Sequence, residues 1–138
     1  MRYAGQAKRI GRHWAVDVPE LGVHTQGTSK MNAFEMAVEA LEIIVDKRGF
    51  KAELFSGPNG YFEITGNDQQ ALFSLLLRQK RRASGLSLAQ VAQRLGLKSR
   101  NSYARYEQGR AVPTATKLAE LLRVIEPGHD FVLTPSRA

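Results

Sequence analysis

The stretch that most constrains the fold is residues 86–113, LSLAQVAQRLGLKSRNSYARYEQGRAVP. Its first part has the i, i+3, i+4, i+7 spacing of an amphipathic helix, with the apolar residues Leu88, Val91, Ala92 and Leu95. Ser87 stands where its hydroxyl can cap that helix. Gly96 can adopt the left-handed conformation that ends it. The sequence therefore predicts a short helix, a tight turn and a second helix.

The second helix of this pair has one apolar and one polar face. Ser99 or Asn101 can cap its start, and Tyr103 and Tyr106 fall on the side that would pack inward. The other positions carry Arg100, Asn101 and Arg105. A helix that is held rigidly by a neighbour, with arginine and asparagine near its N-terminal end, suits the major groove of DNA.

Charge is distributed unevenly along the 138 residues, whose net charge is +7. Residues 1–70 hold eight Lys or Arg and nine Asp or Glu, whereas residues 71–138 hold twelve and four. The basic half coincides with the helix pair, so it predicts a polyanion as partner. The near-neutral half predicts a second module with a different partner.

The composition also excludes several classes of protein. The absence of cysteine rules out disulfides and thiolate metal sites. No apolar run approaches the roughly 20 residues of a membrane-spanning helix, and the basic N-terminus lacks the apolar core of a signal peptide. We expect a cytoplasmic protein with no membrane partner.

The first half mixes short strands with one helix, which predicts an α+β domain with a small antiparallel sheet and one helix across it. Strands are expected at residues 1–7, 14–18, 23–26, 50–55 and 61–65. The helix is expected from about residue 30 to residue 46, with Gly49 ending it. Gly57-Pro58-Asn59-Gly60 predicts the turn between the last two strands.

The second half is predicted to be an all-α domain. A helix over residues 72–83 precedes the helix pair, and Thr114 caps a last helix that ends before Pro127. Residues 131–133 carry a further strand signal. These expectations give a domain at 1–66, a linker at 67–71 and a domain at 72–138. Each is near the lower size limit for a separate core, so we expect a homodimer or higher homo-oligomer.

The second half resembles the helix-turn-helix of the phage-repressor family, known as Cro/C1 or XRE. The resemblance covers residues 75–125 and rests on Ala92, Gly96, Tyr106-Glu107, Gly109 and Pro113. It implies that operator DNA is the partner and that the bases are contacted by Arg100, Asn101 and Arg105. It also implies an ion pair between Arg81 and Glu107. Contacts to phosphates or base edges are assigned to Lys98, Ser99, Ser102, Arg82 and Arg110.

The first half resembles the HicB antitoxin domain, which has a degraded RNase H-like β-β-β-α-β fold. The carrying residues are Arg2-Tyr3, the run WAVDVPELG at 14–22, TQG at 25–27 and Ala37 in the following helix. The resemblance implies an antitoxin without a cofactor. Such a protein binds and silences a small, basic HicA-like ribonuclease and represses its own operon.

Two other functions stay open at this stage. The first is a stand-alone transcription factor whose N-terminal domain senses a ligand or dimerises. The second is a nuclease, which would need clustered carboxylates around a metal ion. The candidate carboxylates are scattered and lack a motif, and the three histidines have no metal-ligand spacing. The carboxylates considered are Asp17, Glu20, Glu63 and Asp68. We therefore expect neither an enzyme nor a metal site.

The predicted helix of the first half carries four acidic residues at i, i+4 and i+3 spacing. They are Glu35, Glu39, Glu42 and Asp46. One interpretation is an ordinary solvated helix face. The other is a docking strip for a basic partner such as a nuclease, because complementary charges steer association.

Overall fold

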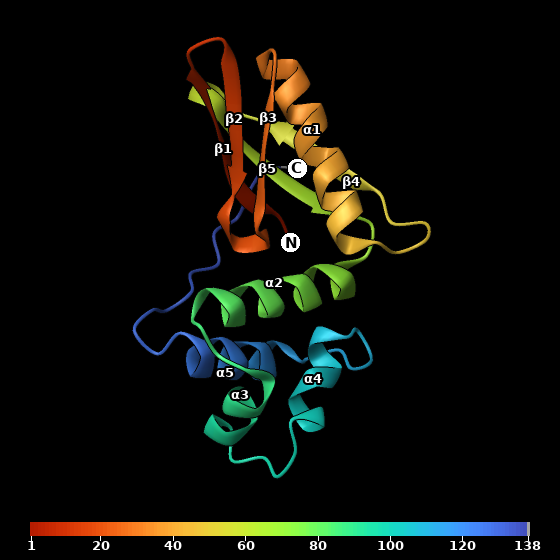
Figure 1. Cartoon of the computed structure of the whole chain (residues 1–138), viewed down its shortest axis with the longest axis vertical. Helices are drawn as coiled ribbons and strands as arrows, with labels where there is room; N and C mark the ends of the chain where they lie inside the picture. Colours follow the sequence, from red (N-terminus) through yellow and green to blue (C-terminus); the bar gives the residue numbers. More distant parts are fainter. Residues whose placement is uncertain (138) are drawn as a thin grey trace. The chain divides into compact units, whose positions relative to one another are not determined.

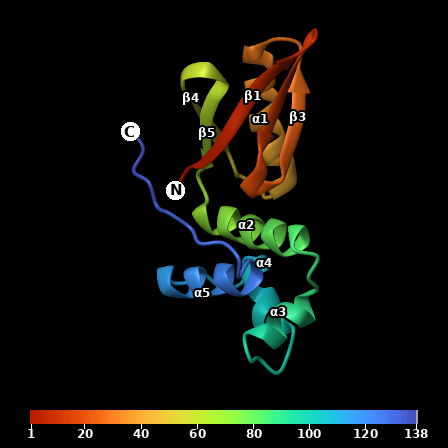
Figure 2. The same cartoon turned by 90° about the vertical axis from the view of Figure 1, so that its left-hand side faces the viewer.

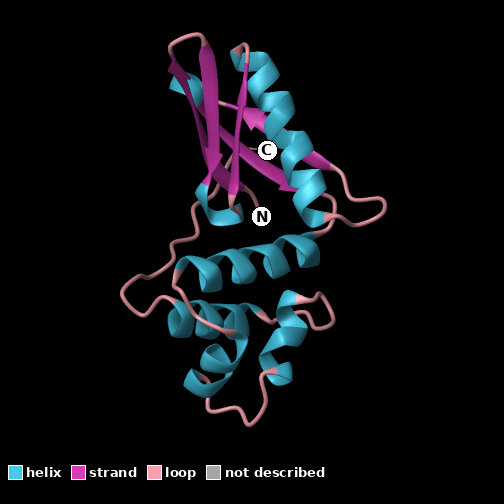
Figure 3. Cartoon of the chain, viewed as in Figure 1, coloured by secondary structure: helices cyan, strands magenta, loops and turns pink. Residues whose placement is uncertain are grey.

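Five strands, one α-helix and two short 3-10 helices (Pro19–Leu21 and Pro58–Gly60) lie before residue 67, and the regular elements described after it are α-helices (Figures 1 and 3). The structure is a computed structural model that describes residues 1–137. It divides into two units, Met1–Leu72 and Phe73–Ala138. Within residues 1–137, no helix is both long and apolar enough to cross a membrane.

The first unit contains one antiparallel sheet of five strands. They are β1 (Tyr3–Ile10), β2 (His13–Val18), β3 (Val23–Gly27), β4 (Ala52–Ser56) and β5 (Tyr61–Gly66). Their order in the sheet is β3-β2-β1-β5-β4. The antiparallel sheet and the final hairpin are confirmed. The order along the chain is β-β-β-α-β-β, one strand more than the β-β-β-α-β pattern of the resemblance. The additional strand, β5, lies between β1 and β4 in the sheet.

One face of this sheet is covered by helix α1 (Lys30–Val45), which runs beside β2 and β3 (Figures 1 and 2). Alternation along β1 buries Tyr3, Gly5 and Ala7 and leaves Ala4 and Gln6 exposed. Apolar side chains of the other strands and of α1 complete the core; they include Val16, Val18, Leu41, Phe62 and Ile64. A Cβ at Gly27 would overlap the Ala33 backbone, so glycine lets α1 lie directly against β3.

Helix α1 begins and ends through local hydrogen bonds. The Ser29 hydroxyl accepts the Asn32 N–H at 3.0 Å, and this caps the start. At the other end Asp46 takes the left-handed conformation with φ 48°, and its N–H donates to the Glu42 carbonyl. The expected stop at Gly49 was therefore wrong, because aspartate tolerates this conformation and ends the helix earlier.

Four helices follow: α2 (Gln69–Ala83), α3 (Leu88–Arg94), α4 (Asn101–Glu107) and α5 (Ala115–Ile125). Helix α2 begins before the predicted residue 72. Asp68 caps it by accepting the Ala71 N–H at 3.0 Å, so residues 69–71 are helical where a linker was expected. The cap at Thr114 is confirmed, since its hydroxyl accepts the Lys117 N–H at 3.1 Å.

The strand signal at residues 131–133 is not followed by a strand. This segment follows α5 as irregular backbone, with 86% of Val132 and 83% of Leu133 exposed. A strand requires a ladder partner, and within residues 1–137 no strand pairs with it. Residues that favour β-structure do not form a strand unless a neighbouring strand is available to pair with them.

Substitutions at two glycines test the turn geometry of the first unit. Gly11 and Gly60 both have positive φ, but a Cβ meets nothing at Gly11 and overlaps the Ala7 carbonyl at Gly60. Gly11→Ala should lower the free energy of unfolding by about 1 kcal/mol from strain alone. Gly60→Ala should lower it by about 3 kcal/mol, because steric overlap adds to the strain.

Urea unfolding followed by the fluorescence of Trp14, the only tryptophan, measures both losses in this unit. Equal losses for the two variants would contradict the close approach at Gly60.

Candidate nucleic-acid interface

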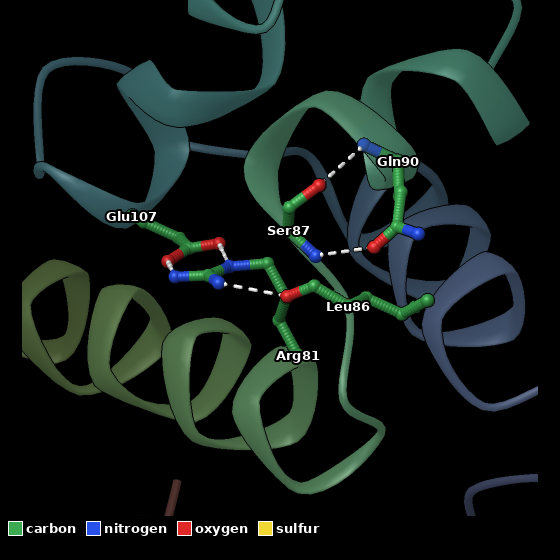
Figure 4. A network of polar contacts seen from close by, with 5 residues as sticks. All are labelled: Arg81, Leu86, Ser87, Gln90 and Glu107. Carbon is green, nitrogen blue, oxygen red and sulfur yellow. Dashed lines mark hydrogen bonds and ion pairs between the residues drawn. The ribbon is translucent and has the colours of Figure 1, made fainter.

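Helix α3 is fixed at both ends by the residues that predict it. The Ser87 hydroxyl accepts the Gln90 N–H at 3.1 Å, and the Gln90 side-chain oxygen accepts the Ser87 N–H at 2.8 Å (Figure 4). These reciprocal bonds form a capping box. Gly96 follows the C-cap residue Leu95 and has φ 73°. The predicted cap and stop of the first helix are confirmed.

Helix α4 follows the turn and has two distinct faces. Neither capping alternative, Ser99 nor Asn101, occupies the N-cap position, which is Arg100 and has no side-chain cap hydrogen bond. The Ser99 hydroxyl, one residue earlier, accepts the Asn101 N–H at 3.2 Å. The buried face consists of Tyr103, Ala104, Tyr106 and Glu107. The exposed positions at and around the helix are Arg100, Asn101, Arg105 and Gln108. The inward orientation of both tyrosines is confirmed. The three candidate base-contacting side chains lie on α4 and on the residue just before it.

One arginine connects α2 to α4 and to the loop before α3. The Arg81 guanidinium of α2 donates to both carboxylate oxygens of Glu107, from Nε at 2.7 Å and from Nη2 at 2.9 Å (Figure 4). Its Nη1 donates to the Leu86 carbonyl at 2.9 Å, just before the α3 cap. The hydrogen bond to Glu107 raises the pKa of Arg81. The structure therefore contains the ion pair that the family resemblance implies, with Glu107 as a structural residue.

The Arg81–Glu107 pair is shielded from water. Only 13% of the Arg81 side chain and 5% of the Glu107 side chain are exposed. Screening by solvent and salt is weak at such a site, so the paired charges are strongly coupled. Removing one partner would leave the other charge buried without compensation.

Ser74 supplies a second connection to α4 that the sequence analysis did not identify. Its buried hydroxyl donates to the Tyr106 carbonyl at 2.7 Å, and so joins α2 to the last turn of α4. The signal in the sequence is one serine inside the apolar run ALFSLLL. A serine on the inward face of an apolar helix requires a hydrogen-bond partner, and a helix-end carbonyl provides one.

The residues assigned to phosphates or base edges lie on several elements. Lys98 and Ser99 lie in the exposed turn before α4, and Ser102 is half-buried within it. Arg110 follows α4, is exposed and donates to the Gln108 side chain. Arg82 lies in the last turn of α2 and is exposed. These positions leave their assigned roles as predictions.

The four acidic residues of α1 do not share one role. Glu42 accepts the Ala52 N–H at 3.1 Å and so satisfies the first residue of β4. Asp46 ends the helix. Glu35 and Glu39 are exposed, and within residues 1–137 neither forms an ion pair.

The carboxylates considered for metal binding lie beside cations or other partners. Asp17 pairs with His24 at 2.7 Å, and Glu63 pairs with Arg2 at 3.2 Å. Asp68 contacts Lys47, whose hydrogen bond is the main cause of its lowered pKa. In the described part of the chain, no group of three or more His, Asp or Glu is placed to hold a metal ion.

Comparison with known proteins identifies the second unit. Residues 72–126 match a family model described as a helix-turn-helix domain. No curated protein matches the chain significantly. The match covers most of α2 and the whole of α3, α4 and α5, and so includes the α2–α4 pair that the Arg81 and Ser74 contacts join. The C-terminal part of the chain is therefore a helix-turn-helix domain, which supports DNA binding.

Breaking the buried pair should destabilise this domain. Glu107→Ala leaves the Arg81 charge without its carboxylate, so we expect the free energy of unfolding to fall by about 3 kcal/mol. The double variant Arg81→Met, Glu107→Leu should recover most of the loss, because no unpaired charge remains. Thermal and urea unfolding followed by circular dichroism at 222 nm measures both effects.

The matched control is Glu120→Ala, which breaks the exposed Lys117–Glu120 pair of α5. It should change the free energy of unfolding by less than about 0.5 kcal/mol. If Glu107→Ala were as mild as this control, the pair would not hold the domain together.

Proposed function

We propose that this chain is a sequence-specific repressor and that α4 contacts the bases of its operator. One observation carries the proposal: Asn101 and Arg105 of α4 and Arg100 just before it are exposed, while the buried face of the helix is fixed by Arg81 and Ser74. A helix held in this way can present its side chains without reordering its backbone. Such pre-organisation favours specific binding.

The chemistry of the three exposed side chains fits the major groove. An arginine can donate two hydrogen bonds to O6 and N7 of guanine, and an asparagine can pair with N6 and N7 of adenine. Lys98, Arg82 and Arg110 would bind phosphates, and their binding would release counterions. A dimer would place two such helices about 34 Å apart, one turn of the duplex.

We further propose that the first unit is a HicB-type antitoxin domain that binds a small, basic HicA-like ribonuclease. In that case the operon that the second unit represses is the protein's own. The resemblance at residues 14–22 and 25–27 supports this partner. Helix α1 supports it independently, because Glu35 and Glu39 lie in an exposed row between Met31 and Ile43, which are 70% and 67% exposed. Exposed carboxylates between apolar side chains fit a basic protein surface.

DNA binding is tested with duplexes that the wild-type chain enriches from a random-sequence pool. Arg100→Ala should weaken binding to the enriched duplex by ~1–3 kcal/mol and relax the preference at one base pair. Lys98→Ala should weaken binding to all duplexes alike and lower the salt slope by about one. If Arg100→Ala, Asn101→Ala and Arg105→Ala all bound like wild type, the assignment of α4 would be wrong.

We expect that a reading frame next to this gene encodes a small basic protein, and the antitoxin role is tested with that protein made in an inactive form. Glu39→Lys should weaken the complex about tenfold or more, because it places like charges together. Glu53→Lys is the matched control, since it reverses an exposed charge on β4 instead of α1.

Calorimetry measures both affinities. No binding by the wild-type chain would favour the stand-alone repressor. Equal weakening by both variants would exclude α1 as the contact.

A further inference from the structure

Arg105 is held in place on the exposed face of α4. Its Nε donates to the Ser102 carbonyl at 3.1 Å. Its Nη2 donates to the Tyr106 hydroxyl at 3.4 Å, and the guanidinium carbon lies 5.0 Å from the centre of the Tyr106 ring. The side chain thus has three contacts on its own helix although it remains exposed to solvent.

Tyr106 is itself a fixed point in the domain. Only 9% of the residue is exposed, so packing restrains its ring. Its carbonyl accepts the Ser74 hydroxyl at 2.7 Å, which links it to α2. The phenol hydroxyl is therefore an immobile acceptor next to a surface arginine.

We propose that Tyr106 is a positioning residue that orients Arg105 for a guanine edge. The inference rests on the proposed function, in which Arg105 contacts a base. Of the five N–H donors of a guanidinium, two are used by Ser102 and Tyr106. Three remain, and a bidentate contact to guanine O6 and N7 needs two.

This arrangement affects specificity more than overall affinity. An unrestrained arginine can bind any nearby phosphate, because that attraction does not depend on sequence. An arginine that is already oriented loses less side-chain freedom when it binds one base edge. Removing the Tyr106 hydroxyl should therefore weaken binding to the correct sequence and leave non-specific binding unchanged.

The chain offers a matched pair of variants for the test. Tyr103 lies on the same helix and is fully buried; its hydroxyl lies beside the Glu107 carboxylate and, within residues 1–137, makes no contact with Arg105. Tyr106→Phe and Tyr103→Phe each remove one hydroxyl from a buried ring of α4. Only the first removes a contact to Arg105.

The measurement is the ratio of the dissociation constants of the full chain for calf-thymus DNA and for the duplex enriched by wild type. Tyr106→Phe should lower this ratio roughly threefold to tenfold, the effect of one lost hydrogen bond, with the salt slope unchanged. The variant should lose its sequence preference at a single guanine position of the enriched duplex and keep it at the other positions. Tyr103→Phe should leave the ratio within about twofold of the wild-type ratio.

A double-mutant cycle separates positioning from a general loss of structure. In an Arg105→Ala background, Tyr106→Phe should have no further effect on the ratio. An equal fall in that background, or a wild-type ratio in Tyr106→Phe, would overturn the inference. If wild type enriches no sequence at all, the proposed function itself fails, which is a separate outcome.

Discussion

The helix-turn-helix domain depends on the position of one guanidinium group. Arg81 contacts the last residue of α4 through a two-bonded ion pair and the backbone just before α3 through the Leu86 carbonyl. These contacts hold the last turn of α4 and the backbone that precedes α3 against α2. Seven-residue helices such as α3 and α4 are too short to be stable alone. Their geometry must come from tertiary contacts, and the buried pair supplies a directional one. The contacts on the buried face of α4 therefore determine which of its side chains are exposed.

The two units differ in net charge, and this difference matches the different partners that we propose for them. The basic unit carries α4 and the excess of lysine and arginine that a polyanion would attract. The near-neutral unit has its own sheet, its own helix and its own core. In the proposed antitoxin, one unit binds DNA and the other binds a basic protein. The two partners require opposite charges, which a single surface could not provide.

Local signals predicted most of the fold. The Ser29, Ser87 and Thr114 caps, the turn at Gly57–Gly60 and the two inward tyrosines all follow from short-range chemistry. The errors arose where tertiary context decides. The segment at 131–133 has strand composition but no ladder partner among residues 1–137, and Asp46 ended α1 where glycine was expected. The Ser74 bond and the contact between Tyr106 and Arg105 depend on exact side-chain placement, which spacing alone does not supply.

The most direct test of the account is a crystal structure of the full chain bound to a duplex that it enriches from a random pool. We expect the side chains of Arg100, Asn101 and Arg105 within hydrogen-bond distance of base edges in the major groove. The Arg81–Glu107 pair should be intact beneath them, as it is without DNA. A complex in which α4 lies outside the groove, or in which another element contacts the bases, would contradict the account.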